Sequence, residues 1–363
     1  MIAFFAATPL QMFNCINIKE THFPKERADI FLMTYATDLS KFSESLKNSG
    51  IFENVTILSE PFNKKGRLKF LLSYLFPSGK VKKNLQNNVY DIMFATRIGP
   101  AAIYYYSFLH HVNNKIRFEY YEEGIGDYWT DAYYLNFNSI KVIEKIGYIN
   151  PYKEKLSMWL YRPEYTLVNK QCEMHKIDKV SLNNEWTKKM ASVFNITKSL
   201  PADCKLIYFE QPFFEQQGIT VNDLILLKEM EPIISKDNIY IKLHPGSLSP
   251  KRFIDQGYKI LDFGDIPWEI LIAFIELENV ILAGISTTAI ITPKLIYDME
   301  PRVILLHKCV FDNKKYKNSE FFDLIAASYK KSNKFIQPAC RENIKTELEK
   351  LFTLEETERR GNK

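Results

Sequence analysis

Residues 239–247 read Ile-Tyr-Ile-Lys-Leu-His-Pro-Gly-Ser, and the rest of the chain is organised around this stretch. The apolar run predicts the end of a buried parallel strand, which Pro-Gly terminates. Side chains alternate along a strand, so Lys242 and His244 point to one face at its carboxyl end, where open α/β sheets bind ligands. We therefore expect Lys242 to hold a phosphate and His244 to move a proton. The alternative is a core histidine beside a surface lysine.

Strand and helix patterns alternate along both halves of the chain, which predicts parallel, doubly wound sheets. The 363 residues suggest two domains at about 150 residues each. The expected strands are 2–6, 28–34, 55–58, 91–95 and 117–121, then 205–209, 239–243, 280–283 and 302–306. We expect an α/β fold with Rossmann-like domains over residues 1–165 and 201–335. A crossover at 166–200 joins them, and a helix with a frayed tail follows at 336–363.

Composition excludes several classes of protein. Apolar residues make up 46% and charged residues 25%, as in a soluble globular protein. The net charge of +5 is spread along the chain, which argues against nucleic acid as a partner. Five scattered cysteines without a C-x-x-C pair indicate neither a disulfide framework nor a zinc site. The apolar N-terminus predicts a first strand rather than a signal peptide, and no window suits a spanning helix, so we expect a cytoplasmic protein.

Residues 64–83 differ from the rest, because lysines and an arginine surround a run of Phe, Leu and Tyr. Such a segment can lie on an anionic membrane surface, with its bases near the headgroups. The alternative is a helix packed on the sheet with a solvated basic face. Both interpretations stay open, as does a peripheral location on the inner face of the membrane.

Glu122, Glu123 and Gly124 follow the expected strand 117–121. One carboxylate then faces the crevice, and the glycine lets the chain turn away sharply. A carboxylate in a dry cleft has a raised pKa and can take a proton from a sugar hydroxyl. The alternative is a solvated acidic turn.

Further candidates lie at strand ends and helix starts of the second domain. Ser286 and Thr287 follow the strand 280–283 and open a helix, so their hydroxyls and free amides suit an anion or a simple N-cap. Glu269 starts another helix, where it accepts from ribose hydroxyls or favours the helix dipole. Gln211 ends the first strand and can face the cleft. Neither a Walker-type loop nor G-x-G-x-x-G occurs, which argues against an NTPase or a dinucleotide dehydrogenase.

Together, the acidic-acidic-Gly motif, K-x-H-P, the later Glu and the Ser/Thr pair resemble the bacterial sialyltransferases in order and spacing. The resemblance is greatest to the lipooligosaccharide and capsule sialyltransferase group, which is similar to glycosyltransferase family 52. It runs from the opening strand and T-P-L-Q turn to the Ser/Thr pair. It implies a GT-B fold, in which two Rossmann-like domains face each other across a cleft. The first would be the acceptor side and the second would bind a CMP-sugar.

The resemblance also implies roles for the candidate residues. Glu122 would be the acceptor base with Glu123 behind it, and His244 the acid that serves the leaving phosphate. The substrate-binding set would comprise Lys242, Ser286 and Thr287 at the phosphate, Glu269 at the cytidine ribose, and Gln211, Pro245, Gly246 and Gly124 around them. This chain has Glu-Glu where many relatives carry Asp-Asp. The base therefore stays open among Glu122, Glu123 and Glu215.

The resulting hypothesis is an inverting sialyltransferase without metal or other cofactor. It would transfer sialic acid from CMP-sialic acid to a terminal galactose of a glycolipid, capsule or lipooligosaccharide acceptor, with α-2,3 as the first expectation for the linkage. One alternative is a GT-B glycosyltransferase or epimerase that uses another nucleotide sugar. The other is a non-catalytic glycan- or nucleotide-binding protein. The oligomeric state, a homodimer included, stays open.

Overall fold

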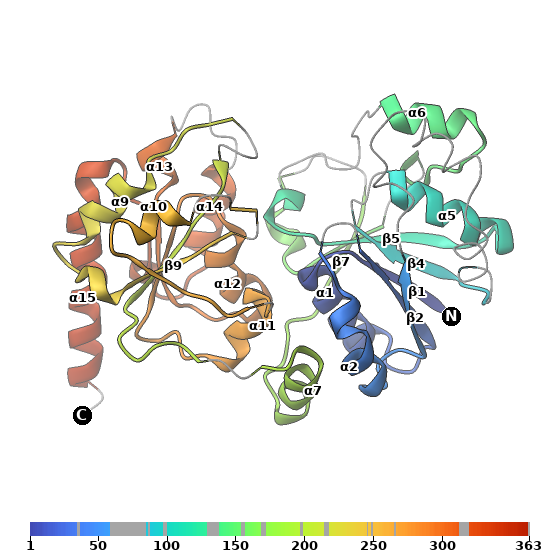
Figure 1. Cartoon of the computed structure of the whole chain (residues 1–363), viewed down its shortest axis with the longest axis horizontal. Helices are drawn as coiled ribbons and strands as arrows, with labels where there is room; N and C mark the ends of the chain where they lie inside the picture. Colours follow the sequence, from blue (N-terminus) through green and yellow to red (C-terminus); the bar gives the residue numbers. More distant parts are fainter. Residues whose placement is uncertain are drawn as a thin grey trace. The chain divides into compact units, whose positions relative to one another are not determined.

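The structure is a computed structural model that describes residues 1–34, 37–58, 85, 88–96, 100–128, 138–153, 157–167, 172–196, 199–213, 218–244, 246–247, 250–264, 266–311 and 319–361. The basic segment 64–83, Glu215 and Pro245 lie outside the described residues. What the sequence suggests for them therefore stays a prediction. The chain divides into two compact units, Met1–Ile196 and Thr197–Lys363. Each unit has its own sheet with helices around it (Figure 1).

In the described part of the first unit, seven parallel strands form one sheet in the order β3-β2-β1-β4-β5-β6-β7. Their bounds are β1 Ile2–Ala6, β2 Ala28–Met33, β3 Asn54–Leu58, β4 Ile92–Ala95, β5 Arg117–Tyr121, β6 Ser157–Leu160 and β7 Glu173–Lys176. The strand order reverses between β1 and β4, which is the switch point of a doubly wound sheet. The inner strands β1, β2 and β4 are buried along their whole length, as expected for a sheet covered on both faces.

Helices of the first unit lie on both sides of this sheet, with α1 and α2 on one side and α5 and α6 on the other (Figure 1). Right-handed crossovers from β1 in opposite directions produce this arrangement. Thr8 caps α1 by accepting from the Gln11 amide, and Pro9 occupies the first turn. The helices are α1 Pro9–His22, α2 Ser43–Asn48, α5 Pro100–Val112, α6 Asn138–Lys145 and α7 Asn184–Phe194, with 3-10 turns η1 Ser40–Phe42, η3 Ile125–Tyr128, η5 Pro151–Lys153 and η6 Pro163–Tyr165.

In the second unit, the described residues form a sheet of six parallel strands in the order β10-β9-β8-β11-β12-β13. The bounds are β8 Leu206–Phe209, β9 Ile239–Lys242, β10 Lys259–Ile260, β11 Ile281–Gly284, β12 Arg302–Leu305 and β13 Phe335–Ile336. The order reverses between β8 and β11, so this sheet has a switch point of its own. The core beneath it combines strand residues such as Tyr208 and Ile241 with Leu348 of the last helix.

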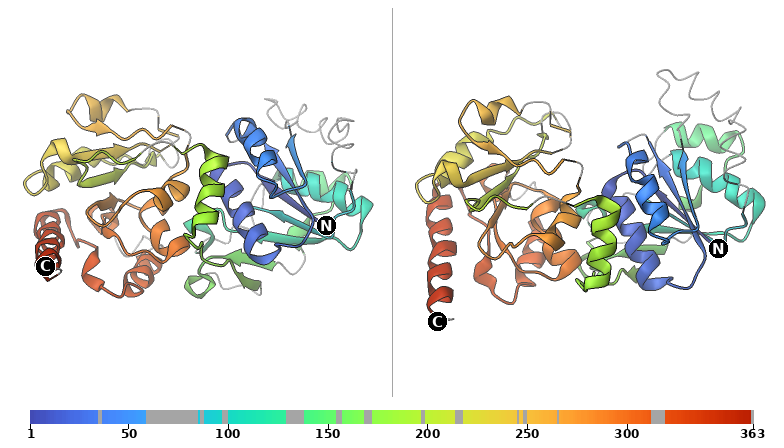
Figure 2. Two further views of the ribbon diagram at one scale, coloured as in Figure 1. Left: turned by 90° about the horizontal axis from the view of Figure 1, so that it is seen from below. Right: turned by 60° about the horizontal axis from the view of Figure 1, so that its bottom comes forward.

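The helices of the second unit are α9 Asp223–Met230, α10 Lys251–Ile254, α11 Trp268–Leu271, α12 Thr292–Tyr297, α13 His307–Val310, α14 Ser319–Ala327 and α15 Ile344–Gly361. Its 3-10 turns are η7 Lys236–Asn238, η8 Ile272–Phe274, η9 Thr288–Ile290, η10 Ser332–Lys334 and η11 Arg341–Asn343. Helix α15 lies at the edge of this unit (red in Figure 2) and contacts α9. Ile344 and Leu351 are buried, which seals the core on that side.

The strands that the sequence predicts are confirmed to within two residues at each end. Strands β6, β7, β10 and β13 are not among them. Edge strand β7, Glu-Met-His-Lys, is mostly polar, and β10 and β13 are two residues each, so these three leave no strong apolar run. Strand β6, Ser-Met-Trp-Leu, is a short apolar run that the sequence analysis did not assign. The expected crossover 166–200 contains β7 and α7, which belong to the first unit. Within the described residues, no helix combines the length and apolar content needed to cross a membrane.

Candidate active site

Three neighbouring strands of the second sheet end in residues that the sequence singled out. Gln211 follows β8, His244 follows β9, and Ser286 follows β11. The register pairs Phe209 of β8 with both Lys242 and Gly284, so the three strands end at the same level. These side chains therefore share one edge of the sheet, at the switch point where α/β folds bind ligands.

His244 is held in one tautomer by the turn that follows it. The Gly246 amide donates to Nδ1 at 3.0 Å, so the neutral ring carries its proton on Nε2. Burial lowers the pKa of His244; the charge of Glu210 opposes this shift, and that of Lys242 adds to it. A Cβ on Gly246 would lie 3.3 Å from Nδ1, a tight contact that would press on the ring. Near neutral pH, His244 thus offers an uncharged N–H donor at Nε2.

Lys242 and Glu269 form a second pair of ionisable groups at this edge. Burial lowers the pKa of Lys242, and the charges of Glu269 and Asp262 oppose the shift. Burial likewise raises the pKa of Glu269, against the Glu269 amide and the charge of Lys242. The Tyr297 hydroxyl donates to the Glu269 carbonyl at 2.6 Å, which fixes the first turn of α11. A poorly solvated ammonium in this position favours an anionic ligand.

Gln211 ties two strand ends together. Its Oε1 accepts from the Ser286 amide at 2.7 Å, and its Nε2 donates to the Ser286 carbonyl at 2.6 Å. Thr287 accepts from the Ala289 amide at 3.3 Å, so it is an N-cap, as one of the sequence interpretations states. A Cβ on Gly284 would lie 2.7 Å from Thr287 Cγ2. Glycine therefore lets Thr287 fold back over the end of β11.

In the first unit, Glu122 follows β5 and is buried, with 4% of its surface exposed. Its Oε2 accepts from the Tyr128 hydroxyl at 2.6 Å and from the Tyr161 amide at 2.9 Å. Burial raises the pKa of Glu122 to about 8, against these two hydrogen bonds and with a small contribution from Asp127. A carboxyl group with this pKa can both accept and release a proton near neutral pH.

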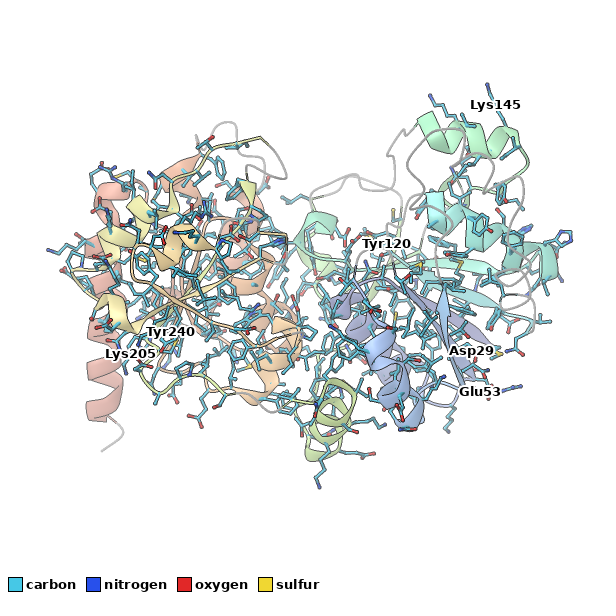
Figure 3. All side chains as sticks on the ribbon, in the orientation of Figure 1. Asp29, Glu53, Tyr120, Lys145, Lys205 and Tyr240 are labelled. Carbon is cyan, nitrogen blue, oxygen red and sulfur yellow. The ribbon has the colours of Figure 1, made fainter. Side chains whose placement is uncertain are left out.

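The neighbouring Glu123 is exposed, and its backbone is fixed by Asp127. Asp127 Oδ2 accepts from the amides of Glu123 at 2.6 Å and Gly124 at 3.3 Å, while Oδ1 accepts from the Tyr120 hydroxyl at 2.6 Å. Tyr120, labelled in Figure 3, comes from the end of β5. The acidic turn is thus built on a buried carboxylate rather than being a loose surface loop.

Helix α1 contributes a buried amide face to the same region. Gln11, Asn14 and Asn17 are spaced by three residues and are each 1% exposed. Gln11 Nε2 donates to Glu123 Oε1 at 3.3 Å, and Asn14 Nδ2 donates to the Glu122 carbonyl at 2.8 Å. The Ala7 amide donates to Gln11 Oε1 at 2.7 Å, which fixes the orientation of that amide. The T-P-L-Q turn therefore positions the Glu122–Glu123 pair.

No known family profile matches the sequence, and no curated protein matches it. Among solved structures, an α/β-galactoside α-2,3-sialyltransferase from Photobacterium phosphoreum is similar, with a TM-score of 0.52, 11% identity, and coverage of 93% of this chain and 98% of that one. A UDP-N-acetylglucosamine 2-epimerase is similar with a TM-score of 0.54, 10% identity, and coverage of 97% and 86%. At such identities the likeness shows the fold. This fold is of the GT-B type. That confirms the fold class that the resemblance implied.

Each of the two units brings together part of the predicted set. The second unit gathers Lys242, His244, Gly246, Glu269, Gln211, Ser286 and Thr287 on neighbouring elements, whereas Glu122, Glu123 and Gly124 lie in the first unit. Sequence reasoning missed Glu210, whose carboxylate contacts the His244 turn. Its only signal was a carboxylate directly before Gln211 at the end of an apolar strand. It also missed Asp127 and the amide face of α1.

Proposed function

We propose that this protein is an inverting glycosyltransferase that transfers sialic acid from CMP-sialic acid to a terminal galactose. The observation that carries the proposal is the pair formed by Lys242 and His244 at the switch-point edge of the second sheet. A half-buried ammonium and an imidazole with its proton on Nε2 suit the single phosphate of a CMP leaving group. The GT-B fold supports this function without selecting it, because one fold hosts many activities.

In the proposed reaction the bond between sialic acid C2 and the phosphate oxygen breaks, and C2 forms a bond to the acceptor oxygen. CMP leaves with the electron pair of the broken bond. Lys242 balances the phosphate charge with help from Ser286 and Thr287, and His244 donates a hydrogen bond from Nε2 to the departing oxygen. A hydrogen bond from a neutral imidazole suffices, because a phosphate monoester has a second pKa of about 6 and leaves as an anion.

The acceptor proton passes to a carboxylate of the first unit, and we assign it to Glu122. Its raised pKa, about 8, matches a general base that works near neutral pH. Glu122 is buried, whereas Glu123 is exposed and therefore more accessible to an acceptor, so Glu123 is the competing candidate. Glu215, outside the described residues, is the reserve. Glu269 would accept from the cytidine ribose, as the resemblance implies.

We further propose that the reaction needs no metal ion. A CMP donor carries one phosphate, and Lys242 with His244 can compensate its charge, whereas a diphosphate donor requires more. The acceptor would be a galactose-terminated glycolipid, capsular or lipooligosaccharide glycan. A peripheral site of action on the inner face of the membrane follows only if residues 64–83 bind anionic lipid.

The test is an incubation of the full chain with CMP-sialic acid and lactose, analysed by mass, in EDTA and with added Mg²⁺. We expect a sialylated product in both conditions. A product that forms only with Mg²⁺ or Mn²⁺ would refute metal independence. Thermal shifts with CMP and UDP form the second arm, because a ligand stabilises the fold that binds it.

Stabilisation by UDP alone, without sialyl transfer, would indicate another nucleotide sugar, as for the epimerase of similar fold. Absence of turnover with every donor would indicate a binding protein. In that case Glu122→Gln and His244→Ala would change affinity at most.

A further inference from the structure

The turn that carries His244 is anchored by a buried carboxylate from the neighbouring strand. Glu210 follows β8 and is 3% exposed. Its Oε2 accepts from the His244 amide at 3.0 Å, and its Oε1 accepts from the Ser247 hydroxyl at 3.2 Å. Its backbone amide donates to the Lys242 carbonyl at 3.0 Å. One side chain therefore holds the first and last residues of the turn 244–247.

We propose that Glu210 is a positioning residue for His244, which fixes the imidazole through the backbone of the turn 244–247. The proposal rests on the proposed function, in which His244 serves the leaving phosphate. The ladder of β9 ends at Lys242, so the His244 amide lies beyond the strand and takes its partner from Glu210. Within the turn, the Ser247 amide donates to the His244 carbonyl at 2.9 Å, and the Gly246 amide donates to Nδ1. Ring and backbone are thus fixed together.

The charge of Glu210 is compensated by an arginine that it shares with a second carboxylate. Arg252 Nη2 pairs with Glu210 Oε1 at 3.0 Å and with Asp223 Oδ2 at 3.1 Å. Arg252 lies on α10, and Asp223 begins α9. Asp223 is as buried as Glu210, at 3% exposed. Removing either charge leaves Arg252 paired with the other carboxylate, so neither change leaves this partly buried cation unpaired.

This symmetry supplies a matched control. Glu210→Gln and Asp223→Asn each neutralise one buried carboxylate that pairs with the same arginine. Only Glu210 bonds to the described residues of the His244 turn. A carboxylate that merely stabilises the fold predicts equal effects of the two changes, whereas a positioning carboxylate predicts different ones.

The experiment compares both variants with the wild-type full chain by three readouts. These are the melting temperature, the NMR titration of the His244 ring, and kcat and KM with CMP-sialic acid. The His244 signal is assigned as the one that is absent from the spectrum of His244→Gln. We expect both variants to lower the melting temperature by similar amounts. We expect only Glu210→Gln to lower the pKa of His244, since it removes a negative charge that faces the ring and leaves Lys242 there. The same variant should lower kcat by roughly 10- to 100-fold, with KM changed less than about twofold.

Ser247→Ala is the milder test, because it removes one hydrogen bond to Glu210 without altering a buried charge. It should lower kcat in the same direction but less, at an unchanged melting temperature. If Glu210→Gln does not fold, Ser247→Ala decides alone, and a wild-type kcat in that variant would overturn the proposal. Equal effects of Glu210→Gln and Asp223→Asn would overturn it too. If the wild-type protein is inactive with CMP-sialic acid, the proposed function is wrong. The titration needs no turnover, so the difference between Glu210→Gln and Asp223→Asn can still be measured.

Discussion

At the scale of single residues, burial moves two proposed catalytic groups toward their neutral forms. The pKa of Glu122 rises to about 8, and that of His244 falls below its ordinary value. Each retains specific partners: Tyr128 and the Tyr161 amide for Glu122, and the Gly246 amide for His244. Ionisable groups with shifted pKa values at strand ends are typical of functional sites.

The pH dependence of transfer can decide which carboxylate is the base. If Glu122 accepts the proton, it must be ionised, so kcat/KM should rise with pH through its pKa of about 8. Glu122→Gln should lower transfer by roughly 10² to 10⁴-fold at the plateau. Glu123→Gln is the control and should keep the rise near pH 8. If transfer were lost only in Glu123→Gln, the general base would be Glu123 instead.

The same group should make the first unit less stable as the pH rises from about 4.5 to about 8. The pKa of Glu122 is raised from 4.5 to about 8 in the folded state, so between these values the folded state binds more protons than the unfolded chain. Stability then falls as pH rises, with about 1.4 kcal/mol for each unit of pKa difference. Glu122→Gln cannot titrate and should flatten this dependence. Denaturant unfolding of both proteins at pH 5 and pH 9 measures it, and parallel losses in the two would contradict the raised pKa.

At the scale of elements, side chains join the residues that follow β8, β9 and β11, in addition to the backbone hydrogen bonds between these strands. Gln211 joins β8 to the Ser286 backbone, and Glu210 joins β8 to the His244 turn. Gly284 allows Thr287 to close over β11. In the first unit, the amide face of α1 likewise donates hydrogen bonds to the two glutamates that follow β5. In both units, hydrogen bonds with polar side chains hold the residues that follow the strands in fixed turns.

The closure over β11 predicts a reciprocal pair of substitutions. Gly284→Ala places a Cβ 2.7 Å from Thr287 Cγ2, and such overpacking costs about 1–3 kcal/mol. Thr287→Ser removes Cγ2 but keeps the hydroxyl that caps η9, so it should restore most of the stability lost in Gly284→Ala. Thr287→Ser alone should be nearly neutral. Free energies of unfolding for the two single variants and the double variant give the coupling; purely additive values would show that this contact is not the cause.

At the scale of the whole molecule, each unit is a doubly wound sheet with its own core and switch point. The proposed phosphate-binding groups lie in the second unit and the proposed base in the first. This division means that the proposed donor binding and acceptor activation rest on different compact units. Mutations should therefore separate the two functions.

Hydrogen exchange with and without CMP tests this separation. We expect CMP to protect the ends of β8, β9 and β11 and to leave the strands of the first unit unchanged. Lys242→Ala should weaken CMP binding by roughly 10- to 100-fold, as for the loss of a hydrogen bond to a charged group. Glu122→Gln should leave the calorimetric Kd within about twofold. Protection centred on β1 and β5, together with weaker binding by Glu122→Gln, would contradict the division.

The fold class follows from the sequence alone, because buried parallel strands are continuous apolar runs that end at recognisable breakers. Runs such as Ile2–Ala6 and Ile239–Lys242 have this form. Helix starts such as Thr8-Pro9 are recognisable in the same way, from a capping residue followed by proline. The sequence also determines which polar residues stand at the strand ends, since a strand delivers its next residues to a known edge. It does not reveal strands as short or as polar as β10 and β7.

Only the tertiary structure decided how these polar residues are used. Glu122 and Glu123 are chemically identical neighbours, yet one is buried against Tyr128 and the other is exposed. Glu210 matters through contacts 34 to 42 residues away along the chain, with His244 and Arg252. Burial and hydrogen bonding depend on which distant segments pack against a side chain. The local pattern therefore predicts where a charged group stands, and the packing around it sets its protonation and its partner.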